Sequence, residues 1–323
     1  DDESYTILYD AGNWNRQDVV HYLSKQNISY IDLIIISHPH ADHIGQLAQI
    51  MNTFEVGEVW MSGNTTTSRT FQSALEAVLA SGANYYEPRA GEVFDIGNLV
   101  LEVIHPEQLT GKLNEDSISV RMTYGDISFL LTGDAFKQDE LAMLQRTDQI
   151  QAQILRLGHH GSDTSSHPRF LEAVQPEVAI YSAGLNNQYG HPHQEVIERI
   201  QQMGIPLYGT DVHGTIIVTT NGLDYAITTS KEGTVELKDE QAIQHTEKGI
   251  ETDSQTAQKT DCIDINHASF EALQQIIHIG PVRAEELISL RPFQSVDDLI
   301  KINGIGKSRL NDIKTQGLAC VGG

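Results

Sequence analysis

Ser37-His38-Pro39-His40-Ala41-Asp42-His43-Ile44-Gly45 is the stretch of sequence that decides the fold. It follows an apolar run at 31–36 that is typical of a buried strand, and it precedes a periodic apolar stretch at 44–51 that predicts a helix. A turn between strand and helix can aim two of these side chains at one point and two at a second. Imidazole and carboxylate groups bind zinc-type catalytic metals, and paired metals activate water at neutral pH. We therefore interpret the stretch as a two-metal site rather than a histidine-rich surface loop.

Other predicted strands also end in a polar group beside a glycine. Residues 128–132 lead into Gly133-Asp134, residues 154–157 into Gly158-His159-His160-Gly161, and residues 5–9 into Asp10-Ala11-Gly12. Side chains at strand ends converge on one rim of a sheet, so a single site explains all four strands. A carboxylate at Asp134 could bridge two metals there.

The chain resembles the metallo-β-lactamase-fold hydrolases, whose pattern is HxHxDH, then a lone Asp after a strand, then a lone His after a later strand. The resemblance implies an α/β fold, an αββα sandwich, in which Asp10 is the early structural aspartate. It implies two divalent ions, with zinc as the first expectation and manganese as the alternative for this ligand mixture. The implied ligands are His38, His40 and Asp134 for one metal, and Asp42, His43, Asp134 and His160 for the other.

The strings at 130–135, 159–162, 189–192 and 210–214 resemble the extracellular hydrolase domain of ComEC-type competence proteins. This resemblance covers roughly residues 5–228. The superfamily often has a further histidine ligand before the lone Asp, but residues 113–120 contain no histidine. His105 could serve instead, or one metal has an open position.

Several candidate residues surround the expected ligands. We assign Asp42 and His159 to catalysis. His159 contacts the substrate phosphate or acts as a general acid, with a packed neighbour of His160 as the alternative. His191 and His213 lie in family-like strings, and we assign them a substrate role.

Residues 264–316 repeat a helix, a tight turn with glycine, and a second helix. Residues 264–269 introduce a first helix, with Asn266 or Ser269 as its cap, and we expect further helices at 282–290 and 308–314. The turns, 277–281 and 302–307, present backbone N–H groups at a helix N-terminus, an arrangement that binds phosphate without reading bases. The expected DNA contacts are Gly280, Gly304, Ile305, Gly306, Lys307 and Arg309, with added positive charge from Lys301 and Lys314.

This region resembles the paired helix-hairpin-helix domain of ComEA-type DNA receptors over about the last sixty residues. His278 departs from the pattern, because it stands where a glycine is usual. The resemblance implies sequence-nonspecific DNA binding. A small helical protein-interaction domain is the alternative.

Length and composition predict two domains. We expect a hydrolase domain at 1–230, a flexible acidic linker at 231–261 and a helix-hairpin-helix domain at 262–323. Most of the net charge of −23 falls on residues 1–230. An acidic hydrolase domain repels polyanions, so the nearly neutral C-terminal domain is the better DNA contact.

The two cysteines, Cys262 and Cys320, bracket the C-terminal domain. A compact domain brings its ends together, which favours a disulfide and an extracellular or cell-surface location. Two free thiols in a cytosolic protein are the alternative. No signal peptide or transmembrane run is visible. The chain lacks an initiator Met and starts directly before the strand that carries Asp10, so we expect a truncated N-terminus.

Together these features predict a metal-dependent phosphodiester hydrolase that acts on DNA, outside the cell, in DNA uptake. A phosphodiesterase of wall polymers such as phosphorylcholine-bearing teichoic acid is one alternative. A DNA-binding receptor with a weak or silent hydrolase domain is another. The sequence carries no signal of the oligomeric state.

Overall fold

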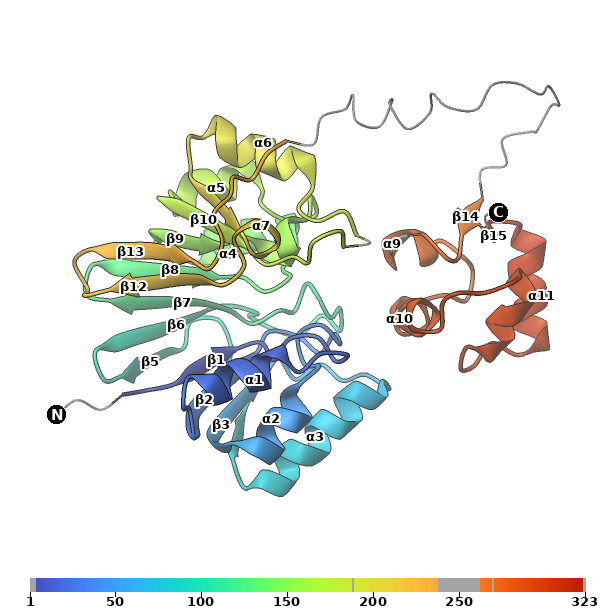
Figure 1. The fold of residues 1–323 in the computed structure, drawn as a ribbon, viewed down its shortest axis with the longest axis horizontal. Helices are drawn as coiled ribbons and strands as arrows, with labels where there is room; N and C mark the ends of the chain where they lie inside the picture. The colour runs from blue at the N-terminus through green and yellow to red at the C-terminus, as the bar shows by residue number, and fades with distance from the viewer. Residues whose placement is uncertain (1–3, 188, 238–261, 269, 322–323) are drawn as a thin grey trace. The chain divides into compact units, whose positions relative to one another are not determined.

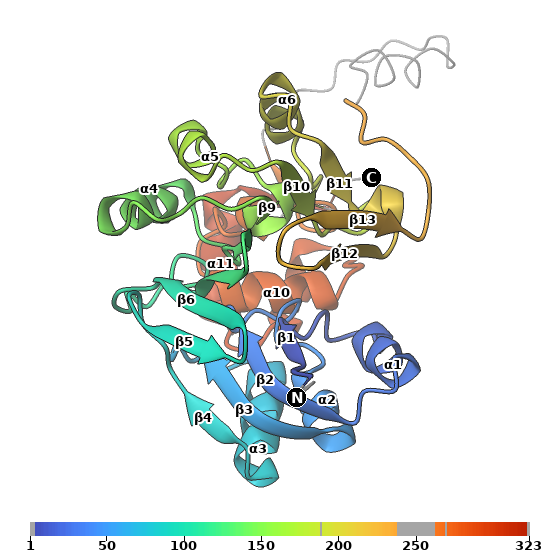
Figure 2. The ribbon, with the colours of Figure 1, turned by 90° about the vertical axis from the view of Figure 1, so that its left-hand side faces the viewer.

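The computed structural model describes residues 4–187, 189–237, 262–268 and 270–321. The chain forms two compact units, and the first comprises Asp1–Leu185 and His191–Leu237. The first unit is a sandwich of two sheets with helices on both outer faces (Figures 1 and 2). The second unit, described from Cys262 onward, is mainly helical. The predicted fold class is confirmed.

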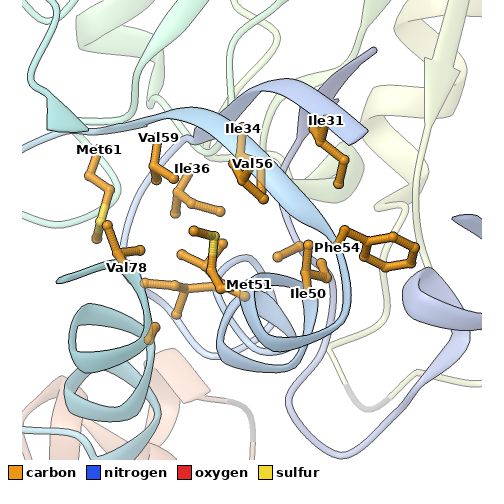
Figure 3. Packing of buried hydrophobic residues seen from close by; sticks show 14 of the residues in the cluster. Ile31, Ile34, Ile36, Ile50, Met51, Phe54, Val56, Val59, Met61 and Val78 are labelled. Atoms are coloured by element: carbon orange, nitrogen blue, oxygen red, sulfur yellow. The ribbon is translucent and has the colours of Figure 1, made fainter. Parts of the chain in front are cut away.

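The first sheet is entirely parallel. Its strands, in order across the sheet, are β1 (Ile7–Tyr9), β2 (Tyr30–Ile36), β3 (Glu55–Met61) and β4 (Asn84–Tyr86). Its outer face is covered by the helices α1 (Asp18–Lys25), α2 (Leu47–Thr53) and α3 (Arg69–Ser81). Figure 3 shows this core, where side chains of β2 and β3 meet those of α2 and α3.

The position of β2 between the helices and the second sheet explains why its sequence is apolar on both faces. Ile34 and Ile36 pack toward the helices, whereas Leu33 and Ile35 pack toward the second sheet. Successive side chains of a strand point to opposite faces, and both faces of this strand are covered. The run therefore lacks the polar alternation of a half-exposed strand.

The second sheet is mixed. Its strands, in order, are β11 (Leu207–Gly209), β10 (Val178–Tyr181), β9 (Ile154–Arg156), β8 (Ile127–Leu131), β7 (Ser119–Tyr124), β6 (Leu99–His105) and β5 (Val93–Ile96). The pairs from β5 to β8 are antiparallel, and those from β8 to β11 are parallel. The remaining elements of this half are α4 (Lys137–Arg146), η1 (Gly158–Gly161), α5 (Pro168–Val174), α6 (Gln194–Gln202), α7 (Thr210–His213) and the hairpin of β12 (Ile216–Thr220) and β13 (Tyr225–Thr229).

The first unit continues past the predicted boundary at residue 230. Val235 is 5% exposed and packs into the core between the second sheet and its helices. The Gln201 side chain donates a hydrogen bond to the Val235 carbonyl. Residues 231–237 therefore do not form the start of a free linker. The rest of the predicted linker, 238–261, lies outside the described residues.

The second unit consists of two helical hairpins. Its helices are α9 (Phe270–Leu273), α10 (Pro281–Ser289), η2 (Val296–Lys301) and α11 (Lys307–Gln316). Two short strands, β14 (Ile263–Asp264) and β15 (Ala319–Cys320), pair in parallel beside a disulfide between Cys262 and Cys320. The predicted helices at 282–290 and 308–314 correspond to α10 and α11. No helix in the described parts of the chain is long and apolar enough to cross a membrane.

Asn266 does not act as the predicted helix cap. Its side chain accepts a hydrogen bond from the Phe293 N–H and donates one to the Phe293 carbonyl, at 2.7 and 2.9 Å. Asn266 therefore ties the start of the unit to the segment before η2. The alternative cap, Ser269, lies outside the described residues.

Candidate metal centre and nucleic-acid interface

The candidate metal centre lies where strands of both sheets end. Asp10 follows β1 and the 38–43 turn follows β2, both in the first sheet. Asp134 follows β8 and His160 follows β9, both in the second sheet. The expectation that all four strands share the rim of one sheet was wrong, because a strand's sequence does not state which sheet it joins. The side chains nevertheless meet.

Gly133 allows the two sheets to approach at this rim. It has a φ of +58°, and a Cβ at this position would lie 2.8 Å from the Cβ atoms of both Ser37 and Ser117. Only glycine leaves that space and adopts that φ without strain. The tight turn directs Asp134, whose N–H donates to Ser117 Oγ at 3.1 Å.

Asp134 is the centre of the cluster and is 2% exposed. Its Oδ2 lies 3.3–3.8 Å from the Nε2 atoms of four histidines, which are His38, His43, His159 and His160. Burial alone would raise the pKa of Asp134, but the neighbouring histidines, His43 foremost, hold it well below its usual range. Its Oδ1 is buried and has no hydrogen-bond partner among the residues that the structure describes. A buried carboxylate with an unsatisfied oxygen fits a bound cation.

Two histidines are oriented by partners behind them. His43 Nδ1 donates to Asp10 Oδ2 at 2.8 Å, and Asp10 Oδ1 accepts from the Ser37 N–H at 2.8 Å. His160 Nδ1 donates to the Ser182 carbonyl at 2.8 Å. Each ring therefore presents Nε2 to the cluster, which is the arrangement typical of metal-ligating histidines.

The ligand atoms fall into two overlapping groups, each within 4.8 Å: His38, His43 and Asp134, and Asp42, His43 and His160. His40 adjoins the first group, with its Nδ1 2.9 Å from His38 Nε2. Burial lowers the pKa of His40 to about 4, so its ring is neutral near pH 7, the form that binds metal. The mixture of imidazole and carboxylate suits zinc or manganese. The division of ligands between two metals stays a prediction.

His159 is fixed with one nitrogen toward the cluster. Its Nδ1 forms a 2.7 Å hydrogen bond with Thr164 Oγ1, and its ring stacks on Phe136 with centroids 5.6 Å apart. Its Nε2 lies 3.7 Å from Asp134 Oδ2. Thr164 lies five residues after His159 in the same loop but belongs to no motif that the sequence analysis used. Phe136 comes from a segment more distant in sequence, so its contact depends on the fold.

His191 lies beside the candidate metal centre, and its substrate role stays a prediction. Its ring centroid is 5.5 Å from that of His159 and 6.0 Å from that of His160. Burial, together with the nearby His159, lowers the pKa of His191 to about 3. The structure thus places a buried, neutral imidazole beside the His159–His160 pair.

The predicted roles of His105 and His213 are corrected. His105 Nε2 donates to the Glu115 carbonyl at 2.6 Å, and its Nδ1 accepts from Arg146 at 3.0 Å. His213 Nε2 donates to the Gly233 carbonyl, and its Nδ1 accepts from the Gly209 N–H, both at 3.1 Å. With both ring nitrogens engaged and the side chains buried, these histidines hold loops in place and are not offered to a metal or substrate.

The predicted DNA contacts of the second unit lie at the start of two helices. Gly280 precedes α10 and Gly306 precedes α11, both with extended backbone. The first backbone N–H groups of a helix lack partners within the helix and can bind anions. Ile305 is buried, whereas Gly304, Gly306, Lys307 and Arg309 are exposed.

The positive charge around the second hairpin is smaller than predicted. Lys301 pairs with Asp298 at 2.7 Å, and Lys314 pairs with Asp297. Lys307 and Arg309 are the predicted cations that remain for a phosphate. The Lys314–Asp297 pair escaped sequence reasoning because the two residues lie on separate elements, whereas Lys301 and Asp298 are three residues apart within η2.

Comparisons with known proteins agree with this organisation. Residues 1–184 match the model of the metallo-beta-lactamase superfamily, and residues 258–316 match that of the helix-hairpin-helix motif. The chain is 30% identical over 225 residues to ComE operon protein 3 of Bacillus subtilis, covering 67% of this chain and 29% of that protein. It is 28% identical over 224 residues to recombination protein 2 of Haemophilus influenzae, covering 66% of this chain and 26% of that protein.

A third relative, a deoxyribonuclease of Thioalkalivibrio sp., is 47% identical over 64 residues, covering 20% of this chain and 18% of that protein. The chain thus spans less than a third of the length of each of these curated relatives. The match over residues 1–184, more than half of the sequence, agrees with the two-sheet sandwich and its His/Asp cluster. The chain belongs to the metallo-beta-lactamase superfamily.

Proposed function

We propose that this metal-dependent hydrolase cleaves phosphodiester bonds in DNA. The observation that carries the proposal is the combination, in one chain, of the Asp134-centred cluster with a helix-hairpin-helix unit. Relatives named for competence and recombination, and one named deoxyribonuclease, support a DNA substrate.

Six residues would hold two divalent ions, zinc or manganese: His38, His40, Asp42, His43, Asp134 and His160. Such ions supply an activated water and neutralise charge that develops on the phosphate. Asp10 keeps His43 in the orientation that offers Nε2. His159, held by Thr164, is placed to donate a hydrogen bond to a phosphate oxygen or a proton to the leaving oxygen.

The C-terminal unit would capture DNA without reading its sequence. Backbone N–H groups at Gly280, Gly304 and Gly306, with Lys307 and Arg309, contact phosphates rather than bases. The predicted contact at Ile305 does not use its N–H, which donates to the Ile302 carbonyl at 3.0 Å. Capture by this unit compensates for the acidic first unit, because covalent linkage raises the local concentration of DNA at the hydrolase site. Binding of this kind weakens as salt rises.

We also propose that the protein works outside the cytoplasm, in DNA uptake. Disulfides such as Cys262–Cys320 persist in oxidising compartments and are rare in the cytosol. Competence relatives point to the same process. Accordingly, we propose three segments: a hydrolase domain ending near Leu237, a linker, and the DNA-binding unit from Cys262.

The test uses metal-stripped full-length protein supplied with zinc or manganese. Its substrates are bis-p-nitrophenyl phosphate and unrelated single- and double-stranded DNA. We expect cleavage of both substrate types, and we expect Asp134→Ala to lose bound metal and activity together. Asp148→Ala, which removes an exposed acidic group elsewhere, is the matched control.

Three outcomes contradict parts of the proposal. Unchanged metal content in Asp134→Ala refutes the ligand assignment. Cleavage of the small phosphodiester without cleavage or binding of DNA indicates a different polymer, such as a wall phosphodiester. DNA binding without any hydrolysis indicates a receptor.

A further inference from the structure

The two hairpins of the C-terminal unit are built alike. In the first, the Ile279 N–H donates to the Ile276 carbonyl at 3.0 Å, and in the second, the Ile305 N–H donates to the Ile302 carbonyl at 3.0 Å. Three further pairs occupy equivalent positions: His278 and Gly304, Gly280 and Gly306, Arg283 and Arg309. His278 has a φ of +67° and Gly304 a φ of +78°, so the turns share one backbone shape.

The two equivalent arginines are used differently. Arg309 Nη1 donates to the Gly304 carbonyl of its own hairpin at 2.7 Å. Arg283 contacts both hairpins: its Nη1 donates to the His278 carbonyl and its Nε to the Asn303 carbonyl, each at 3.1 Å. A Cβ at Gly304 would lie 2.9 Å from Arg283 Nη2. The half-buried guanidinium of Arg283 thus lies between the two turns.

Side chains of each helix also brace the opposite hairpin. On α11, Asp312 accepts from His278 Nε2 at 2.8 Å, and Gln316 Oε1 accepts from the Ile277 N–H at 2.7 Å. On α10, Glu286 Oε1 accepts from the Asn303 N–H at 2.9 Å. The turns are therefore fixed by contacts between hairpins as well as within them.

We propose that Arg283 is a positioning residue that joins the two hairpins into one binding surface for the phosphate backbone of DNA. The proposal rests on the DNA-binding role proposed above. A planar guanidinium presents several donors at fixed angles, so it can hold two carbonyl oxygens at once, whereas the single ammonium of a lysine cannot reproduce this geometry. Prealigned turns bind DNA without the cost of ordering each turn separately.

The experiment uses the full chain with metals chelated, so that DNA is bound and not cut. Fluorescence anisotropy with two unrelated labelled duplexes gives Kd over a series of salt concentrations. The variants are Arg283→Lys, Arg283→Gln and Arg309→Gln, and Arg69→Gln removes an exposed charge from the first unit as a control. Circular dichroism fixes a temperature at which all variants are folded.

We expect Arg283→Lys to weaken DNA binding about tenfold although it removes no charge. A tenfold change in Kd corresponds to the loss of about one hydrogen bond between a charged and a neutral group. Because one hairpin then disengages, the slope of log K against log salt should flatten by at least ~0.9, the value for one phosphate contact. Arg309→Gln should flatten the slope by about one contact, and Arg69→Gln should change neither quantity. Arg283→Gln should bind no better than Arg283→Lys.

Wild-type affinity and slope in Arg283→Lys would overturn the proposal. If that variant does not fold, Arg283→Gln decides. Its shorter side chain has a single nitrogen and cannot place donors at the positions of both Nε and Nη1, so its binding must fall below that of Arg309→Gln. Failure of wild type to bind either duplex at low salt would instead remove the proposed DNA function, and with it this proposal. In a separate assay with zinc or manganese restored, the Arg69→Gln control should hydrolyse bis-p-nitrophenyl phosphate at the wild-type rate.

Discussion

Reducing the Cys262–Cys320 disulfide should destabilise the C-terminal unit by about 4 kcal/mol. The bond closes a loop with a sequence separation of 58 residues. The entropy that such a cross-link removes from the unfolded chain corresponds to about 4 kcal/mol at 25 °C. A helical unit of this size rarely stores more than about 3–5 kcal/mol in its core. Reduction should therefore leave the unit close to the midpoint of unfolding.

The chain offers an internal control for this experiment. It contains two cysteines, both in the C-terminal unit, and two tryptophans, Trp14 and Trp60, both in the first unit. In urea, tryptophan fluorescence therefore follows the first unit, while far-ultraviolet circular dichroism also includes the helices of the second. We expect reductant, or Cys262→Ser with Cys320→Ser, to shift a transition in the circular dichroism signal and to leave the fluorescence transition in place.

Reduction of the disulfide should affect DNA binding, which we assign to the second unit, and not hydrolysis, which we assign to the first. At 37 °C the reduced protein should lose DNA binding while it still hydrolyses bis-p-nitrophenyl phosphate. The expected destabilisation is absent if thiol titration shows both cysteines reduced and the unfolding free energy from circular dichroism falls by less than about 1 kcal/mol, well below the loop-entropy value.

Three other predictions concern the first unit. Thr164→Val releases the ring of His159 and should lower kcat about 10–100-fold at unchanged metal content, as loss of an orienting contact does; an unchanged kcat would exclude a role for His159 in the reaction. Burial raises the pKa of Glu140 from 4.5 to about 8, so the folded protein retains a proton that the unfolded chain releases between these values. The unfolding free energy should fall as pH rises through this window and fall less in Glu140→Gln; superimposable pH profiles from urea unfolding would contradict this. His105→Gln should cost about 1–3 kcal/mol of stability while metal content and kcat stay at wild-type values; loss of metal would restore His105 as a ligand.

Local sequence was sufficient for much of the metal centre. The apolar run of β2 and the histidine-rich turn after it lie next to one another in the chain, so the motif predicts both the strand end and the ligands. Asp134 and His160 could be found for the same reason, because each follows a short apolar strand. What a strand's sequence lacks is its partner, and this is why the division of the four strand ends between two sheets was missed.

The errors share a physical cause. His105 and His213 have the residue type of a ligand, but their nitrogens are satisfied by Arg146 and by Gly233, which are remote in sequence. Lys314 looks like a free cation until the fold places Asp297 beside it. Arg283 shows the same limit of sequence reasoning. It occupies the position equivalent to Arg309, and only the fold shows that Arg283 contacts both turns whereas Arg309 contacts its own turn.

Because the candidate metal centre lies at a rim shared by two sheets, it is complete only after both sheets have folded and docked. The first sheet supplies one set of the proposed ligands and the second supplies Asp134 and His160, so a nascent chain with only one sheet in place holds an incomplete set. Metal that binds the complete set stabilises the docked sandwich by mass action and adds little to either half alone. Under the DNA hydrolase activity proposed above, the protein would acquire this activity only when both sheets are in place, which would spare nucleic acids near the site of synthesis.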